Sequence, residues 1–145
     1  MKFSYECPVH VLADRMSQNL QKYSQYASMR PFCIAVTLVG CDEEFGPRCY
    51  RIDPSGQSTG FRAVATGSKE QEAMSQLEKQ FKKNNGDWDS RQTVETAITV
   101  LQAVTSSDFK ADEVEIGYCT VENPRFRKLT TQEIENVLND LADKQ

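Results

Sequence analysis

The chain has 145 residues, of which 39% are hydrophobic and 26% are charged, and its net charge at pH 7 is −4. This length suits one domain with a single core, so residues 1–145 are interpreted as one domain. The acidic balance argues against a nucleic-acid partner, and no apolar run approaches the roughly 20 residues of a membrane span.

The five cysteines form no C-x-x-C pair, and there is one histidine. Zinc sites and disulfide frameworks both need regular spacings of such residues, which the chain does not have. We therefore expect reduced thiols, no metal site and no cofactor.

The first half of the chain predicts one helix followed by three antiparallel strands. Apolar residues recur every three or four positions over 8–27, which indicates an amphipathic helix that Arg30-Pro31 ends. The run FCIAVTLV at 32–39 is typical of a central strand covered on both faces. A polar loop at 42–47 leads to a strand at 48–52, and Asp-Pro-Ser-Gly at 53–56 predicts a turn before a third strand at 58–65.

The second half predicts three helices and one strand. A helix at 68–83 has acids at its start and lysines at its end, and Asn-Asn-Gly follows it. Asp89 or Ser90 caps a helix that reaches about Thr105, and a strand follows at 114–121. Thr130 and Glu133 form a capping box for the last helix. The order α-β-β-β-α-α-β-α predicts an α+β layered fold.

The stretch Ala-Thr-Gly-Ser-Lys at 65–69 has the small residues and the lysine of a phosphate-binding loop. A P-loop needs G-x-x-x-x-G-K-[ST], whereas here the lysine follows the serine and the Gly60–Gly67 spacing is wrong. We therefore interpret the stretch as a strand-to-helix corner. Gly67 lets the backbone turn, and Ser68 with Gln71 forms a capping box.

A Ser-His-Asp or Cys-His site would need His10 as its base, because there is no other histidine. His10 falls outside the apolar positions of its helix and is interpreted as solvated. The acid pairs at 43–44 and 112–113 are interpreted as solvated charges, and Trp88 as a core residue. Spacing alone thus predicts no catalytic residues.

Several strings, taken in order along nearly the whole chain, resemble the eukaryotic 20S proteasome α subunits, and most closely their α type-6 (α1) branch. One set of residues resembles the family's α-subunit signature: Asp53-Pro54-Ser55-Gly56, followed by Ala63, Ala65, Gly67, Ala73 and Leu77-Glu78-Lys79. Four further strings resemble the α type-6 branch in particular: Met29-Arg30-Pro31, Asp42-Glu43-Glu44-Phe45-Gly46-Pro47, Thr93-Val94-Glu95-Thr96-Ala97-Ile98-Thr99 and Val121-Glu122-Asn123-Pro124.

This resemblance implies a four-layer α-β-β-α sandwich of the N-terminal-nucleophile (Ntn) hydrolase type. The chain would be its C-terminal part, without the portion that carries the gating tail, the first helix and the first strands. The implied role is a non-catalytic structural subunit of a seven-membered α ring, active in ring assembly, pore gating and regulator docking for ubiquitin-dependent protein degradation. The implied partners are neighbouring α subunits, β subunits of the adjacent ring and regulatory particles, in cytoplasm and nucleus, with no nucleic acid and no membrane.

Catalytic sister subunits of this family use a threonine that cleavage of a Gly-Thr bond leaves at the N-terminus. This chain contains no Gly-Thr dipeptide. Those subunits also share an Arg-Asp-x-x-Ser-Gly run, and the matching stretch here, 107–112, keeps only the aspartate, Asp108. A non-catalytic subunit is therefore expected. The alternatives are a catalytic β-type subunit whose nucleophile precedes this stretch, or an unrelated α+β ligand-binding domain.

Overall fold

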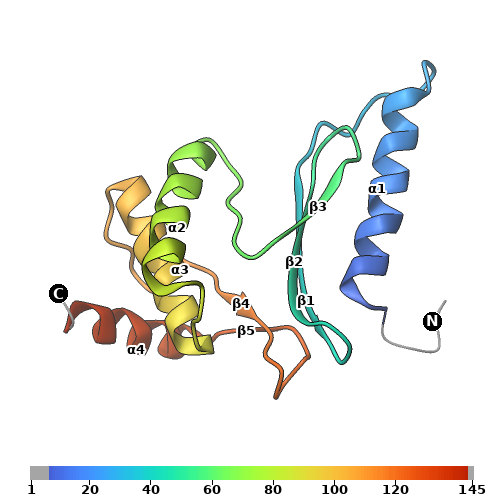
Figure 1. Cartoon of the computed structure of the whole chain (residues 1–145). Helices are drawn as coiled ribbons and strands as arrows, with labels where there is room; N and C mark the ends of the chain where they lie inside the picture. Colours follow the sequence, from blue (N-terminus) through green and yellow to red (C-terminus); the bar gives the residue numbers. More distant parts are fainter. Residues whose placement is uncertain (1–6, 144–145) are drawn as a thin grey trace. The chain divides into compact units, whose positions relative to one another are not determined.

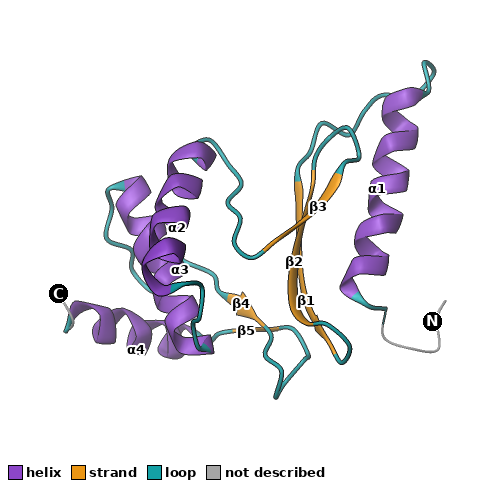
Figure 2. Ribbon diagram, viewed as in Figure 1, coloured by secondary structure: helices purple, strands orange, loops and turns teal. Residues whose placement is uncertain are grey.

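The computed structural model describes residues 7–143, which form four helices and five strands (Figures 1 and 2). These residues belong to two compact units. Unit 1 comprises the chain up to Thr66 together with Cys119–Arg125, and unit 2 comprises Gly67–Tyr118 and the chain from Phe126 onward. Helices and antiparallel sheets confirm the α+β prediction, whereas the assignment of residues 1–145 to a single domain stays a prediction.

The first helix of unit 1, α1, spans Val9–Gln25, close to the predicted 8–27. Pro8 precedes its first turn as the N-cap residue, where a missing N–H costs nothing. Tyr26 takes an extended conformation and ends the helix. The buried residues of α1 are Val9, Ala13 and Leu20, which share one face. The periodic apolar pattern therefore does identify a helix with one packed side.

Three antiparallel strands follow as the predicted meander, in the order β1-β2-β3. They span Val36–Asp42, Gly46–Ile52 and Ser58–Phe61. Helix α1 runs along this sheet (Figure 1) and packs against it. The core between them consists of buried Ala13, Leu20 and Ile52, with Met16, Leu38 and Tyr50 packed around it.

The prediction of a central strand at 32–39 was wrong in both position and setting. Strand β1 begins at Val36 and lies at the edge of the three-stranded sheet of the described residues. Phe32 and Ile34 precede it and are 49% and 47% exposed, and Val39 within it is 49% exposed. An apolar, β-branched run indicates strand propensity, but the faces that become covered depend on partners that propensity does not specify.

The Asp-Pro-Ser-Gly turn connects β2 to β3 and also docks on α1. The Gly56 N–H donates to the Asp53 carbonyl oxygen at 3.0 Å, which closes the predicted turn. The Ser17 hydroxyl donates to the Gly56 carbonyl oxygen, and the Ser24 hydroxyl donates to that of Pro54 at 2.9 Å. Gly56 has a φ of +91°, and a Cβ there would come within 2.6 Å of the Gln21 backbone nitrogen. Glycine is therefore required both by its backbone conformation and by the closeness of the helix.

The Asp53 side chain organises this turn from inside. Its Oδ1 accepts hydrogen bonds from the Ser55 hydroxyl at 2.5 Å, the Ser55 N–H at 2.9 Å and the Gln57 N–H at 3.0 Å. These donors, led by the Ser55 hydroxyl, lower the pKa of Asp53. The ionised aspartate thus fixes the turn that α1 contacts.

Unit 2 contains helices α2 (Glu70–Asn84), α3 (Ser90–Thr105) and α4 (Thr131–Ala142). The predicted stop signal after α2 is confirmed by Asn85, which has the left-handed conformation of a helix C-cap. Asp89 caps α3 in a capping box with Gln92, and the predicted box of Thr130 and Glu133 caps α4. The buried apolar residues of this unit are Ile98, Val100, Val104, Ala111 and Ile134.

The strand predicted at 114–121 is mostly not formed. Only Gly117–Tyr118 is a strand, β4, and it pairs with β5, Arg127–Lys128, which the sequence analysis did not predict. Beyond β4, the Thr120 N–H donates to the Asn123 carbonyl oxygen at 3.0 Å, so the chain turns there. The predicted strand was therefore too long, because pairing partners decide how many residues join a ladder.

Candidate functional site

The corner at 65–69 is a tight turn into α2, but its capping differs from the prediction. The N-cap residue of α2 is Lys69, without a side-chain cap, so the predicted box of Ser68 and Gln71 is wrong. The Glu70 N–H donates to the Gly67 carbonyl oxygen at 3.2 Å, and Gly67 has the positive φ, +138°, that the corner interpretation requires.

Lys69 is engaged inside unit 2 rather than available to a phosphate. Its Nζ donates to the Val104 carbonyl oxygen at 2.6 Å, in the last turn of α3. The last carbonyls of a helix lack intrahelical partners and carry partial negative charge, so a lysine is favourable there. A shallow depression is lined by residues 67–72, and its acids, Glu70 and Glu72, would repel an anion. The structure thus gives a physical reason for rejecting the phosphate-loop interpretation.

His10 is not simply solvated, contrary to the sequence interpretation. Its Nδ1 lies 4.0 Å from Asp42 Oδ2, and its ring meets the Phe45 ring edge-on at 5.4 Å between centroids. Both of these polar atoms are buried without a hydrogen-bond partner. The β1–β2 hairpin covers the first turn of α1, which helical periodicity could not show. Cys7, the nearest thiol in sequence, directs its hydrogen bond to the Pro8 carbonyl oxygen at 3.7 Å.

The remaining candidates are either solvated or structural. Glu43 and Glu44 are exposed at the tip of the β1–β2 hairpin, as expected of solvated charges. Glu113 is also exposed, but it accepts a hydrogen bond from the Lys110 N–H at 3.0 Å and closes a local turn. Trp88 is half-buried against Phe81, with 5.9 Å between ring centroids, which fits the predicted packing role.

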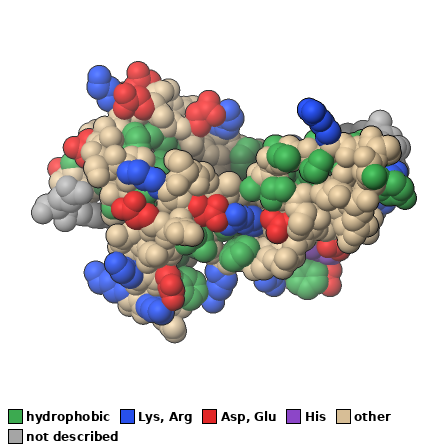
Figure 3. Space-filling model, turned by 90° about the horizontal axis from the view of Figure 1, so that it is seen from above, with side chains coloured by type: hydrophobic (Ala, Val, Ile, Leu, Met, Phe, Trp, Pro, Cys, Tyr) green, Lys and Arg blue, Asp and Glu red, His purple; other side chains and the backbone are tan. Residues whose placement is uncertain are grey.

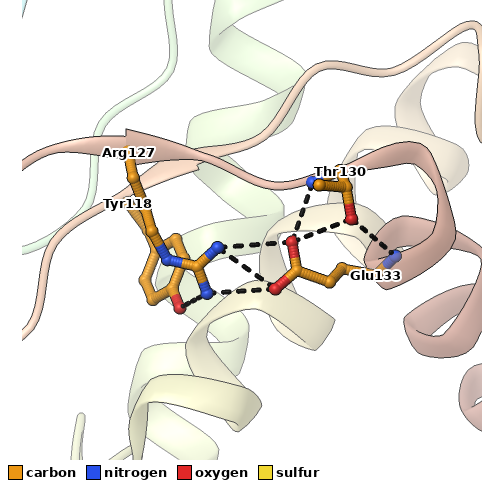
Figure 4. Close-up of polar contacts among 4 residues, drawn as sticks. All are labelled: Tyr118, Arg127, Thr130 and Glu133. Atoms are coloured by element: carbon orange, nitrogen blue, oxygen red, sulfur yellow. Dashed lines mark hydrogen bonds and ion pairs between the residues drawn. The ribbon is translucent and has the colours of Figure 1, made fainter.

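A cluster of four side chains joins the β4–β5 hairpin to the start of α4 (Figure 4). Arg127 donates to both carboxylate oxygens of Glu133, at 3.1 to 3.3 Å, and to the Tyr118 hydroxyl. Its guanidinium carbon lies 4.7 Å from the Tyr118 ring centroid. Glu133 also accepts from the Thr130 N–H at 2.8 Å and from the Thr130 hydroxyl at 3.0 Å. One carboxylate therefore serves both as a helix cap and as the partner of a cation.

These contacts determine the protonation state of Glu133. Arg127, and then the Thr130 N–H and hydroxyl, lower the pKa of Glu133 to about 2. A carboxyl with this pKa is ionised at neutral pH and cannot act as a general acid. The cluster borders a shallow groove of about 300 Å³ whose apolar wall is formed by Val94, Leu129 and Val137. The arrangement of the cluster fits a structural role, in which it holds the β4–β5 hairpin against the start of α4.

Within residues 7–143, no group of three His, Cys, Asp or Glu side chains could hold a metal ion. All five cysteines are free. None of the helices that the structure describes is both long and apolar enough to span a bilayer. Basic and acidic side chains are interspersed on the face shown in Figure 3, without a continuous basic stripe.

The sequence alone missed several of these contacts. It predicted the Thr130–Glu133 box, because that signal has a fixed spacing. The additional bonds that Arg127 donates to Glu133 and to the Tyr118 hydroxyl involve the β4–β5 hairpin, which the sequence did not predict. The contact of Lys69 with Val104 likewise joins two helices, and sequence spacing carries no signal for such a pair.

A comparison with known protein families shows which family the chain belongs to. The family described as "Proteasome subunit" matches residues 1–119. This chain belongs to that family. Its helices and antiparallel sheets are consistent with the α+β Ntn-type proteasome fold.

Curated relatives in this family are named as α subunits. The chain is 41% identical over 143 residues to the probable proteasome subunit alpha type-1 of Schizosaccharomyces pombe. It is 36% identical over 143 residues to the proteasome subunit alpha type-6 of Caenorhabditis elegans. Each alignment covers 99% of this chain and 58% of the relative. An archaeal proteasome subunit alpha, from Pyrococcus horikoshii, is 32% identical over 141 residues, which are 97% of this chain and 52% of that protein.

These matches confirm the resemblance to proteasome α subunits that the sequence strings indicated. The chain spans somewhat more than half the length of the relatives it matches.

Proposed function

We propose that this chain acts as a non-catalytic structural subunit of the α ring of the 20S proteasome. The observation that carries the proposal is the match to α-named subunits over 99% of the chain, at 41% and 36% identity. The proposed partners are neighbouring α subunits in a seven-membered ring, β subunits of the adjacent ring, and regulatory particles. The proposed roles are ring assembly, pore gating and regulator docking in ubiquitin-dependent protein degradation, in cytoplasm and nucleus.

The residues of the chain support a role without catalysis. The stretch 107–112, which matches the Arg-Asp-x-x-Ser-Gly run of the catalytic sister subunits, keeps only Asp108. The only histidine, His10, lies against Asp42 and Phe45, and Glu133 is held ionised by Arg127.

The direct test is to purify the natural gene product through a C-terminal tag and to weigh the intact assembly by native mass spectrometry. We expect the chain inside a barrel-shaped particle that also contains other α and β subunits. Recovery of the chain only outside such particles would refute the α-ring role.

A second measurement separates the α role from the catalytic alternative. The purified particle is treated with an electrophile that reacts with N-terminal threonine, and the labelled subunits are identified by mass spectrometry. The α role predicts label on other subunits and none on this chain. A labelled N-terminal threonine in the natural form of this chain would instead establish the β-type alternative.

A further inference from the structure

The segment that connects β5 to α4 has a basic pattern that is found at no other hydroxyl residue of the chain. Thr130 follows Arg127 by three positions and Lys128 by two. No other serine or threonine in the sequence has a basic residue at both of these positions. Protein kinases select substrates by charge pattern, and one large class binds basic side chains two and three residues before the hydroxyl. The pattern therefore indicates Thr130 as a phosphate acceptor.

The structure presents this segment in a form that such an enzyme can bind. Arg127–Lys128 is strand β5, and Thr130 has the extended backbone angles φ −74° and ψ 157°. Thr130 is exposed, and the side chains of Arg127 and Lys128 are 43% and 66% exposed. Each of these two cations pairs with one carboxylate at the surface, and exposed ion pairs are weak enough for an enzyme to displace.

Arg127 lies where it can bind a phosphate on Thr130 (Figure 4). Its guanidinium donates to both oxygens of the Glu133 carboxylate, at 3.1 to 3.3 Å. The Thr130 hydroxyl donates to one of the same oxygens, Oε2, at 3.0 Å. The hydroxyl and the guanidinium thus contact one carboxylate, so a group attached to the hydroxyl oxygen would lie next to Arg127.

We propose that Thr130 is phosphorylated by a protein kinase that selects basic residues, and that the phosphate draws Arg127 away from Glu133. The phosphate replaces the hydroxyl hydrogen, so the bond to Glu133 is lost, and its charge of about −1.5 to −2 repels that carboxylate. Arginine binds phosphate oxygens through two parallel N–H bonds, as it now binds the carboxylate. The greater negative charge makes the phosphate the stronger partner of Arg127.

The reaction is a phosphoryl transfer from ATP. The Thr130 hydroxyl oxygen attacks the γ-phosphorus and loses its proton to a base of the kinase. The bond between the γ-phosphorus and the oxygen that bridges it to ADP breaks. The products are phosphothreonine, ADP and a proton, and nothing is oxidised or reduced.

The test incubates the full chain with ATP and the catalytic subunit of cyclic-AMP-dependent protein kinase, which selects basic residues. Trypsin cuts after Lys128, so the peptide 129–144 contains both Thr130 and Thr131. Thr131 is the first residue of α4 and serves as the neighbouring comparison. A Thr131→Ala variant removes the ambiguity of position. A parallel reaction uses an acid-directed kinase, because Glu133 follows Thr130 by three positions.

We expect phosphate on Thr130 in the Thr131→Ala chain, no phosphate on this peptide in Thr130→Ala, and several-fold slower incorporation in Lys128→Gln. Circular dichroism verifies that each variant is folded. In folded chain, a lack of phosphate on Thr130 would overturn the proposal. Labelling of Thr131 alone, labelling of Thr130 by the acid-directed kinase alone, or equal rates with Lys128→Gln would also overturn it.

The transfer of Arg127 is measured by phosphorus NMR of the phosphorylated Thr131→Ala chain as a function of pH. The control is its tryptic phosphopeptide 129–144, which lacks Arg127. The second pKa of a free phosphothreonine is about 6, and a neighbouring guanidinium favours the more charged form. The folded chain should therefore titrate at lower pH than the peptide. An added Arg127→Lys substitution keeps a basic residue for the kinase but cannot form two parallel bonds, so its shift should be smaller. An absent shift, or an equal shift with lysine, would refute the transfer of Arg127.

Discussion

Replacement of Gly56 by alanine tests the docking of the β2–β3 turn on α1. The new Cβ would lie 2.6 Å from the Gln21 backbone nitrogen and 2.7 Å from the Ser17 carbonyl oxygen, both in the helix backbone. Neither atom can move aside by a side-chain rotation. The residue would also have to keep a φ of +91°, which L-amino acids with a side chain rarely adopt.

The magnitude follows from two contributions. The left-handed backbone conformation costs a non-glycine residue about 1–2 kcal/mol. Forcing extra volume into a packed contact costs about 1–3 kcal/mol more. We therefore expect the Gly56→Ala variant to lose about 2–5 kcal/mol of its free energy of unfolding, a large fraction of the about 5–15 kcal/mol typical of a domain. Urea denaturation followed by far-ultraviolet circular dichroism measures this loss.

Gly46 provides the matched control in the neighbouring hairpin. It also has a positive φ, +66°, but no atom lies within 4 Å of a Cβ built there. The Gly46→Ala variant should therefore lose only the backbone contribution of about 1–2 kcal/mol. Equal losses in the two variants would refute the close approach of the turn to α1.

Three further predictions concern unit 2. Glu133 has a pKa lowered to about 2 by Arg127 and Thr130, whereas its pKa in the unfolded chain is about 4.3. The stability that these bonds contribute is therefore fully present above about pH 4.3 and is lost as the pH falls toward about 2. Glu133→Gln should therefore flatten the acid branch of a thermal-midpoint profile between pH 5 and 2. Lys69→Met removes the bond to the α3 C-terminus and should lower the free energy of unfolding by about 0.5–1.5 kcal/mol in urea denaturation. Asp89→Ala removes the cap of α3 and should cost about 1 kcal/mol in the same assay.

Each of these variants has a control on the same element or of the same type. Glu135→Gln removes an exposed carboxylate of α4 and should leave the acid branch unchanged. Lys79→Met removes an exposed lysine of α2, and a loss as large as that of Lys69→Met would contradict the role given to the Val104 contact. Asp87→Ala changes an exposed aspartate two residues before the cap, and an equal loss there would contradict the capping role of Asp89.

The sequence by itself determined the features that depend on neighbours along the chain. The four helices, the meander and the Asp53–Gly56 turn were predicted because periodicity and turn chemistry act over a few residues. The capping boxes at Asp89 and Thr130 illustrate the same point only in part, since the similar signal at Ser68 did not produce a cap. The family resemblance rested on strings of this local kind.

Only the tertiary structure decided which faces are covered and which polar groups meet. Only the end of the apolar run at 32–39 belongs to a strand, the edge strand β1, and several residues of the run are exposed, because burial of a face depends on what packs against it. His10 lies against Asp42, and Lys69 bonds the end of α3, since folding joins elements that are distant in sequence. The requirement for glycine at position 56 comes from both the local sequence and the tertiary structure. Its turn could be predicted from four residues, but its closest contact is with a helix backbone that only the folded chain brings there.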